Sequence, residues 1–197
     1  MTIFISFIFG AIAWSLCEYL LHRYVGHSKK VIGGFTKEHR SHHIDGNHFM
    51  PLRKKIRMSL RLLIPLSVLT TFIMGDHIGV GFSSGFFLFF IAYEVLHKRA
   101  HTHPPMNGYG RWVRKHHFFH HFAAPHKNFG VTSPLWDLVF GTYTPVGCIR
   151  LPAKKAMSWL LDPQTQDVFS IYAQDYQIRV RRKPRKRAIA DHAMDAQ

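Results

Sequence analysis

TIFISFIFGAIAWSLCEYLLHRYVGH, residues 2–27, runs from an unbroken apolar stretch directly into two histidines. The first twenty of these residues, 2–21, contain no lysine or arginine, and twenty residues of α-helix span about 30 Å, the thickness of the hydrocarbon core of a bilayer. A cleaved signal peptide is the competing interpretation, but the stretch has neither a positively charged start nor a small-residue cleavage site. We therefore expect a membrane anchor that ends in a histidine pair.

A second apolar block, residues 58–97, also ends at a histidine. Its glycine-rich middle, 75–85, predicts the turn of a hairpin. We expect one span at about 59–76 and a stronger one at about 78–97. A shallow or re-entrant hairpin is the alternative, because the first segment is short for a span unless Arg61 extends its charged head to the membrane surface.

The basic residues are segregated along the chain. The composition of 26 Lys+Arg against 11 Asp+Glu, a formal net charge of +15, would by itself suit a partner such as nucleic acid. None of the 26 lies in residues 1–21 or 62–97, however, and ten lie in 22–61. A nucleic-acid-binding domain has no need of such segregation, so we expect no nucleic-acid partner. The positive-inside rule places the N-terminus outside, and 22–61 and everything after His97 on the cytoplasmic side.

Ten histidines fall into four short clusters, all on the side of the membrane that the charges make cytoplasmic. The clusters are HxxxxH at 22–27, HxxHH at 39–43, HxxxH at 97–101 and HxxHH at 117–121. Neutral imidazole is a good ligand for iron or zinc. Residues i, i+3 and i+4 of a helix share one face, so we expect each HxxHH to direct three nitrogens to one point. An isolated histidine is usually an ordinary surface or core residue, but four such clusters are hard to explain in that way.

Ten imidazoles exceed what one metal takes, since a zinc site uses about four ligands. They suit two metals with four or five nitrogens each. Glu38 is the one carboxylate inside a cluster, which argues against a carboxylate-bridged bundle built on ExxH pairs. The sequence therefore predicts a dinuclear, all-histidine centre at the membrane face. Its candidate ligands are His22, His27, His39, His42, His43, His97, His101, His117, His120 and His121.

These observations predict an all-α membrane protein with two to four transmembrane or re-entrant helices and a cytoplasmic helical cap that holds the dinuclear histidine site. RWVRKHHFFHHF at 111–122 should be helical, and 128–142 should form a loop with a short amphipathic helix. We expect a membrane-embedded, histidine-rich domain at 1–149 and a cytoplasmic C-terminal extension at 150–197. The tail of this extension, 179–187, carries seven basic residues that either attract anionic lipid head groups or are simply solvated.

The four clusters, in this order, resemble the histidine boxes of the fatty acid hydroxylase/sterol desaturase superfamily. The boxes are HRYVGH at 22–27, HRSHH at 39–43, HKRAH at 97–101 and HFFHH at 117–121. NFGVTSPLWDLVFGT, residues 128–142, is similar to the stretch that follows the last box in the fatty acid hydroxylase branch. The resemblance extends over most of residues 12–143.

This resemblance implies a membrane-embedded non-haem di-iron oxygenase, with 1–149 as the hydroxylase domain and the ten box histidines as ligands. Such an enzyme would use two iron ions and O₂ to hydroxylate a C–H bond of a fatty acyl or other lipid substrate, and the purified protein can carry zinc instead. The resemblance identifies no substrate-binding residue. Because the apolar segment begins at residue 2, we expect a separate electron donor of the reductase, ferredoxin or cytochrome type, which would dock on the basic cytoplasmic face.

Three other functions remain open. A carotenoid (β-ring) or sterol-type hydroxylase/desaturase shares the HxxxxH and HxxHH boxes, although the carotenoid group has a third box with a spacing different from HKRAH. A metal transporter or sensor would need polar ligands inside the spans, whereas residues 2–17 and 62–75 contain neither histidine nor charge. An inactive oxygenase is the third alternative, and the intact boxes argue against it.

Two carboxylates lie one helical turn before a candidate ligand. Glu18 precedes His22 by four residues, and Glu94 precedes His97 by three. Metal-bound histidines usually donate their second N–H to a carboxylate or carbonyl, so we predict that Glu18 and Glu94 support the ligands in this way. Pairing with a basic residue at the helix end, such as Arg23, is the alternative.

The remaining histidines are weaker candidates for the centre. His116 is expected to point away from the metals, whereas His103 and His126 are candidates for contacts around it. Asn128 and Asp137 belong to the stretch that resembles the family. A structural hydrogen-bonding role is at least as well supported for them as a catalytic one.

Overall fold

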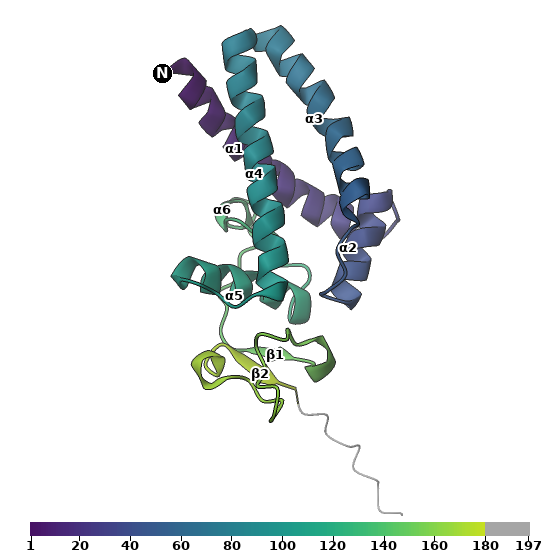
Figure 1. Cartoon of the computed structure of the whole chain (residues 1–197), viewed down its shortest axis with the longest axis vertical. Helices are drawn as coiled ribbons and strands as arrows, with labels where there is room; N and C mark the ends of the chain where they lie inside the picture. Colours follow the sequence, from purple (N-terminus) through teal and green to yellow (C-terminus); the bar gives the residue numbers. More distant parts are fainter. Residues whose placement is uncertain (180–197) are drawn as a thin grey trace, which may run out of the picture.

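The computed structural model describes residues 1–179, and three long helices dominate it (Figure 1). These are α1 (Thr2–Leu20), which continues into the π-helical turn η1 (Leu21–Gly26), α3 (Leu52–Met74) and α4 (Asp76–Thr102). The shorter helices are α2 (Gly34–Ile44), α5 (Gly108–Phe122) and α6 (Leu135–Val139). The C-terminal part contains β1 (Ile149–Leu151), the 3-10 turns η2 (Ala153–Lys155) and η3 (Ser170–Tyr172), and β2 (Tyr176–Ile178).

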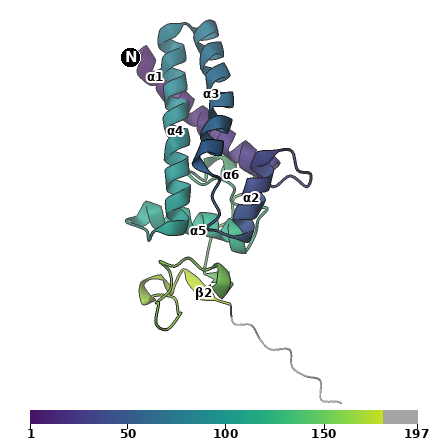
Figure 2. The same cartoon turned by 45° about the vertical axis from the view of Figure 1, so that its right-hand side comes forward.

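The long helices have the length and composition of membrane spans. The three candidate segments are Thr2–Gly26, Leu52–Met74 and Asp76–Thr102. Their outer surfaces are apolar, as Phe72 and Val68 of α3 show, and such surfaces suit lipid better than water. The N-terminus and the α3–α4 turn lie at one end of the molecule, and α2, α5 and the small sheet lie towards the other (Figures 1 and 2). The expected all-α membrane fold is confirmed, with three candidate spans in the part of the chain that the structure describes.

The turn expected over the glycine-rich stretch 75–85 is confined to Gly75, whose φ of 80° is left-handed. The rest of the stretch is part of α4. Its glycines allow close helix contact: a Cβ on Gly85 would lie 2.8 Å from the carbonyl carbon of Phe7 in α1. Small residues at such interfaces let two backbones approach, so glycine here marks a helix contact rather than a loop.

Aromatic side chains join α1 and α4 below these glycines. The indole of Trp14 contacts the rings of Phe86, Phe90 and Tyr93, with centroids 5.2, 5.0 and 5.8 Å away. Leu63 of α3 packs into the same cluster. Edge-to-face contacts of this kind favour a defined orientation, so they fix how the lower ends of α1 and α4 face each other. Both helices carry clustered histidines at these ends.

A two-stranded parallel sheet lies on the side of α5 that faces away from the long helices (Figure 1). β1 and β2 pair with Ile149 opposite Tyr176, and both side chains pack against Phe118 of α5. The sequence did not predict these strands, because three residues are too few to show an alternating pattern. The expected basic tail, 179–187, lies outside the described residues apart from Arg179.

Candidate metal centre

The ten clustered histidines converge near the lower ends of α1 and α4 and form two groups of five. In each group, one nitrogen from each of the five rings lies within 4.8 Å of the others. The first histidine group contains His22, His27, His39, His43 and His120. The second histidine group contains His42, His97, His101, His117 and His121. All ten candidates are thus brought together, and two ligand sets of equal size fit two metal ions.

Each HxxHH box is divided between the two groups. In α2, His39 and His43 belong to the first group and His42 belongs to the second. In α5, His117 and His121 belong to the second group and His120 belongs to the first. The expectation that one box directs three nitrogens to one point was wrong, because consecutive helix residues diverge by about 100° and i+3 and i+4 lean to opposite sides of i. Each box therefore bridges the groups, and the rings of His43 and His121 stack across them at 4.1 Å.

The first box depends on the π-helical turn η1. His22 and His27 are five residues apart, a spacing that an α-helix would turn about 140° apart around its axis. The backbone N–H of His27 instead donates to the carbonyl of His22 at 3.2 Å, the i to i+5 bond of a π-helix. This brings both rings into the first group. The five-residue spacing of the HxxxxH box matches the i to i+5 bond of a π-helix, so the sequence contained an indication of this turn.

Backbone carbonyls fix three of the rings. The Nδ1 atoms of His22, His120 and His42 donate to carbonyl oxygens at 2.5, 2.7 and 3.0 Å. The acceptors are Phe129, Lys127 and His48, respectively. A ring whose Nδ1 carries the hydrogen presents the lone pair of Nε2, and this is the usual way in which proteins orient a metal-binding histidine.

The facing nitrogens suit a cation better than they suit one another. Nε2 of His120 has no hydrogen and a single lone pair, yet two nitrogens face it, Nε2 of His27 at 2.8 Å and Nε2 of His43 at 3.2 Å. Nε2 of His22 and of His121 is buried and has no hydrogen-bond partner in the described part of the chain. Buried polar atoms are rarely left in this state. A set of converging lone pairs with unsatisfied members fits a metal ion bound by nitrogen.

Burial keeps these imidazoles neutral. Desolvation lowers the pKa of His27 and of His42 to about 4, and that of His43 to about 2. The pKa values of four further members are lowered well below the usual range, first by burial and then by neighbouring histidines. These are His39, His117, His120 and His121. A histidine must be neutral to bind a metal, so the rings are ready to do so at neutral pH.

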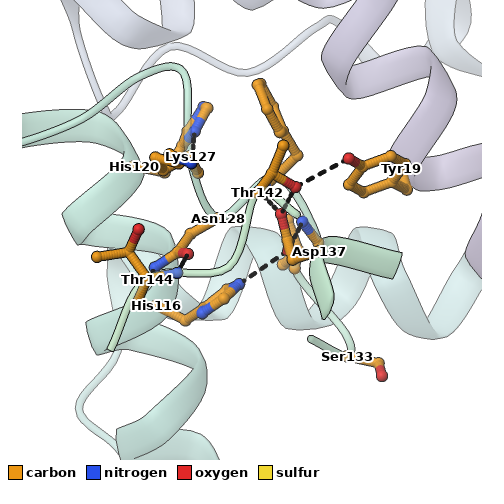
Figure 3. A network of polar contacts seen from close by, with 12 residues as sticks. Tyr19, His116, His120, Lys127, Asn128, Ser133, Asp137, Thr142 and Thr144 are labelled. Atoms are coloured by element: carbon orange, nitrogen blue, oxygen red, sulfur yellow. Dashed lines mark hydrogen bonds and ion pairs between the residues drawn. The ribbon is translucent and has the colours of Figure 1, made fainter. Parts of the chain in front are cut away.

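Asp137 holds the loop that supplies two of the three carbonyls (Figure 3). Its fully buried carboxylate accepts hydrogen bonds from the backbone N–H groups of Phe129 and Gly130, from Thr142 Oγ1 and from His116 Nε2, at 2.7 to 3.1 Å. Burial alone would raise the pKa of Asp137, but these bonds outweigh it and lower the pKa. The carboxylate is therefore charged and structural.

Asn128 completes this loop. Its φ of 54° is left-handed, a conformation that asparagine tolerates. Its side chain exchanges hydrogen bonds with the backbone N–H and carbonyl of Thr144, at 2.7 and 3.0 Å. Asp137 and Asn128 thus form hydrogen bonds that hold the loop, and neither belongs to a histidine group.

The two glutamates have partners other than the expected ones. Glu18 accepts hydrogen bonds from the backbone N–H groups of Val131 and Thr132, and from Thr132 Oγ1. Glu94 forms an ion pair with Lys55. Within residues 1–179 neither carboxylate accepts a hydrogen bond from a histidine. Glu18 reaches the first histidine group indirectly, through the loop whose Phe129 carbonyl holds His22.

Two cavities adjoin the centre from the membrane side. The larger, about 240 Å³, lies between α1, α3 and α4 and is mostly apolar, with Trp14, Leu63 and Phe90 in its wall. The smaller, about 60 Å³, is lined by histidines of both groups. The two cavities share five wall residues, Phe35, Met50, Lys55, Tyr93 and Glu94. The sequence did not predict this wall, because its residues come from elements far apart in the chain and share no spacing.

Comparison with known proteins places the chain in a family. A family model described as fatty acid hydroxylase matches residues 7–142. A dihydroceramide fatty acyl 2-hydroxylase of Arabidopsis thaliana is 30% identical over 152 residues, which cover 75% of this chain and 63% of the relative. The human fatty acid 2-hydroxylase is 30% identical over 156 residues, covering 71% and 39%.

A solved structure supports the same fold. It is that of full-length scs7p, in which only the hydroxylase domain is visible, and it matches with a TM-score of 0.57 and 27% identity over 73% of this chain and 56% of that one. This chain therefore spans less than two thirds of the length of these relatives. The family model nevertheless covers more than half of the 197 residues, and the chain belongs to the fatty acid hydroxylase family.

Proposed function

We propose that this protein hydroxylates a C–H bond of a fatty acyl lipid, with O₂ as co-substrate and two iron ions held by the ten histidines. One observation carries the proposal: a largely apolar cavity between candidate membrane spans adjoins a smaller cavity lined by both histidine groups. Such a wall suits a hydrocarbon chain. The relatives are named as hydroxylases of fatty acyl chains, which agrees with this substrate class.

The residues of the chain have separable tasks in this reaction. The histidines would bind the metals, which when bound supply the O₂ chemistry. The carbonyls of Lys127, Phe129 and His48 keep the imidazoles oriented. The aromatic wall around Trp14 and Phe90 would hold the hydrocarbon and exclude water from it. Positioning of this kind lets a reactive centre attack one carbon of an unreactive chain.

The proposal includes a topology and a partner. The N-terminus would lie outside, and the histidine groups and C-terminus in the cytoplasm, because the basic residues lie beside the histidines and not at the α3–α4 turn. A separate electron-donor protein would supply the electrons, and an acidic one would suit the basic surface. Residues 1–149 would be the catalytic unit and 150–197 an extension of it.

The test is mass spectrometry of lipids from cells that express the wild type or the double variant His120→Ala, His121→Ala, each with a competent reductase. The variant removes one member of each histidine group, and His126→Ala, an exposed histidine outside both groups, is the matched control. We expect acyl lipids to gain one oxygen atom in the wild type and the control but not in the double variant. Oxygen on a carotenoid or sterol, or loss of two hydrogens, would replace the proposal with the rival enzymes. Identical lipids in all strains, with two irons bound per chain, would contradict it.

A further inference from the structure

A charged pair lies where the two membrane-side cavities meet. The ammonium of Lys55, in α3, donates to Oε2 of Glu94, in α4. Both residues line both cavities, and their side chains are only about one quarter exposed. Glu94 also lies one turn before His97, so the pair is close to the second histidine group.

This pair is unusual for its surroundings. Burying an ion pair in an apolar wall has a desolvation cost that well-packed apolar residues would avoid. A wall that served only to hold a hydrocarbon would not need the pair.

The pair also has hydrogen-bonding capacity left over. Two other polar wall residues are engaged: Glu18 accepts three hydrogen bonds from residues 131 and 132, and Ser59 donates to the backbone carbonyl of Lys55. An ammonium has three donors and a carboxylate two acceptor oxygens. In the described chain, the bond between the two side chains uses one ammonium hydrogen of Lys55 and one carboxylate oxygen of Glu94.

We propose that the Lys55–Glu94 pair opens to bind the polar end of the acyl substrate, the Lys55 ammonium donating to the acyl carbonyl oxygen and the Glu94 carboxylate accepting from the amide N–H on the opposite side of the same planar group. This inference rests on the proposed function and assigns the residues that position its substrate. The carbonyl end would lie beside the small cavity lined by His42 and His97, and the hydrocarbon would extend into the large one.

Binding to the metal-loaded, purified protein tests this without turnover. Three probes share a sixteen-carbon chain: N-methylhexadecanamide, N,N-dimethylhexadecanamide and hexadecyl methyl ether. The first offers a carbonyl and an N–H, the second a carbonyl alone, and the third neither. We expect the wild type to bind the secondary amide roughly tenfold more tightly than the ether, as for a hydrogen bond to a charged group.

The variants separate the two contacts. Lys55→Met should bind the tertiary amide and the ether alike, because the carbonyl then has no donor, whereas Lys55→Arg should keep the preference for the amide. Glu94→Met should lose the preference for the secondary over the tertiary amide. Lys54→Met is the matched control, since Lys54 pairs with Glu38 and lines neither cavity, and it should behave as the wild type. Ether affinity reports whether the cavity of each variant remains intact.

Three results would overturn the inference: no preference for the amide in the wild type, an unchanged preference in Lys55→Met, or the same loss in Lys54→Met. Should Lys55→Met fail to bind the ether, the comparison of Lys55→Arg with Glu94→Met decides, and equal selectivity in these two would also overturn it. Hydroxylated lipid in cells together with any of these results means that this inference alone fails. Absence of hydroxylated lipid would instead contradict the proposed function.

Discussion

The two histidine groups have the same composition but are held in different ways. The first depends on a loop, since its His22 donates to the carbonyl of Phe129 and its His120 donates to the carbonyl of Lys127. The second takes two members from α4 and two from α5, and within residues 1–179 its one carbonyl contact comes from His48. One site is therefore positioned largely by a hydrogen-bonded loop and the other by packed helices. Equal ligand sets do not imply equal sensitivity to mutation.

The groups also differ in what they adjoin. His42 and His97 of the second group line the small membrane-side cavity, and His101 lines a separate polar pocket of about 130 Å³ beside Lys154 and Lys155. The first group contributes only His39 to the membrane-side wall. The second group thus lines more of the surrounding cavities, although each group has three buried and two half-buried members.

Removal of one ligand should have the largest effect and tests whether the groups are independent. His120→Ala should lower the metal content from about two ions per chain to about one, and His117→Ala should do the same for the other group. Turnover should fall by at least about 100-fold in both, because even loss of an outer partner of a ligand costs 10–100-fold. Elemental analysis and product mass spectrometry provide the measurements. Loss of both metals in either single variant would show that the two groups form one cooperative site.

Asp137→Ala should have the next largest effect, and it should act on the first group alone. It removes a buried charge that accepts four hydrogen bonds, a change worth on the order of 3–5 kcal/mol in the free energy of unfolding. The loop carbonyls would then lose their position, and metal content should fall to about one ion. Adding His120→Ala should release no further metal, whereas adding His117→Ala should release the second ion.

Asp175→Ala is the control for this experiment. Asp175 also pairs with side chains of α5, namely Arg111 and Lys115, but it lies by the small sheet. It should lower thermal stability and leave two metals bound. Equal metal loss in Asp137→Ala and Asp175→Ala would mean that the first group responds to general destabilisation rather than to its loop.

The sequence predicted which histidines come together far better than it predicted what holds them in place. Histidine clusters are local patterns, and segregated charge predicted that they lie on one side of the membrane. How HxxHH divides between two metals depends on where the neighbouring helices lie, and a single helix does not contain that information. The same holds for His48, whose backbone carbonyl contacts His42 although its side chain carries no cluster signal. Contacts through backbone leave no trace in residue type.

Glycine shows the same limit in the fold. Spacing alone did not distinguish a turn from a helix contact in residues 75–85, because both need a residue without a side chain. Gly85 contacts the backbone of α1, whereas Gly75 forms the turn, and this difference depends on where α1 lies. The spans themselves follow from composition, and they were predictable without any partner.

Gly85→Val should affect both groups together, in contrast to the changes above. The new side chain would meet the backbone of Phe7 and Ala11, and such overpacking costs about 1–3 kcal/mol. It would push α4 away from α1, and these helices hold members of different groups. We expect a lower thermal midpoint and a parallel loss of both metals. Gly147→Val is the control, because its side chain would enter open space, and it should change neither the thermal midpoint nor the metal content. Selective loss of one metal in Gly85→Val would show that the contact between α1 and α4 does not fix the position of one group relative to the other.

Glu18→Gln should have the smallest effect and decides how Glu18 acts. Glutamine keeps the oxygen that accepts from the backbone of Val131 and Thr132, and its amide nitrogen can donate to Thr132 Oγ1. If Glu18 serves only to hold this loop, the substitution should cost about 1 kcal/mol or less and both metals should stay bound, whereas Glu18→Ala should behave as a weaker Asp137→Ala. Thermal midpoint and metal content, measured together on both variants, separate the cases. Loss of the first group's metal in Glu18→Gln at an unchanged midpoint would instead mean that the charge itself supports a ligand, as the four-residue spacing to His22 suggests.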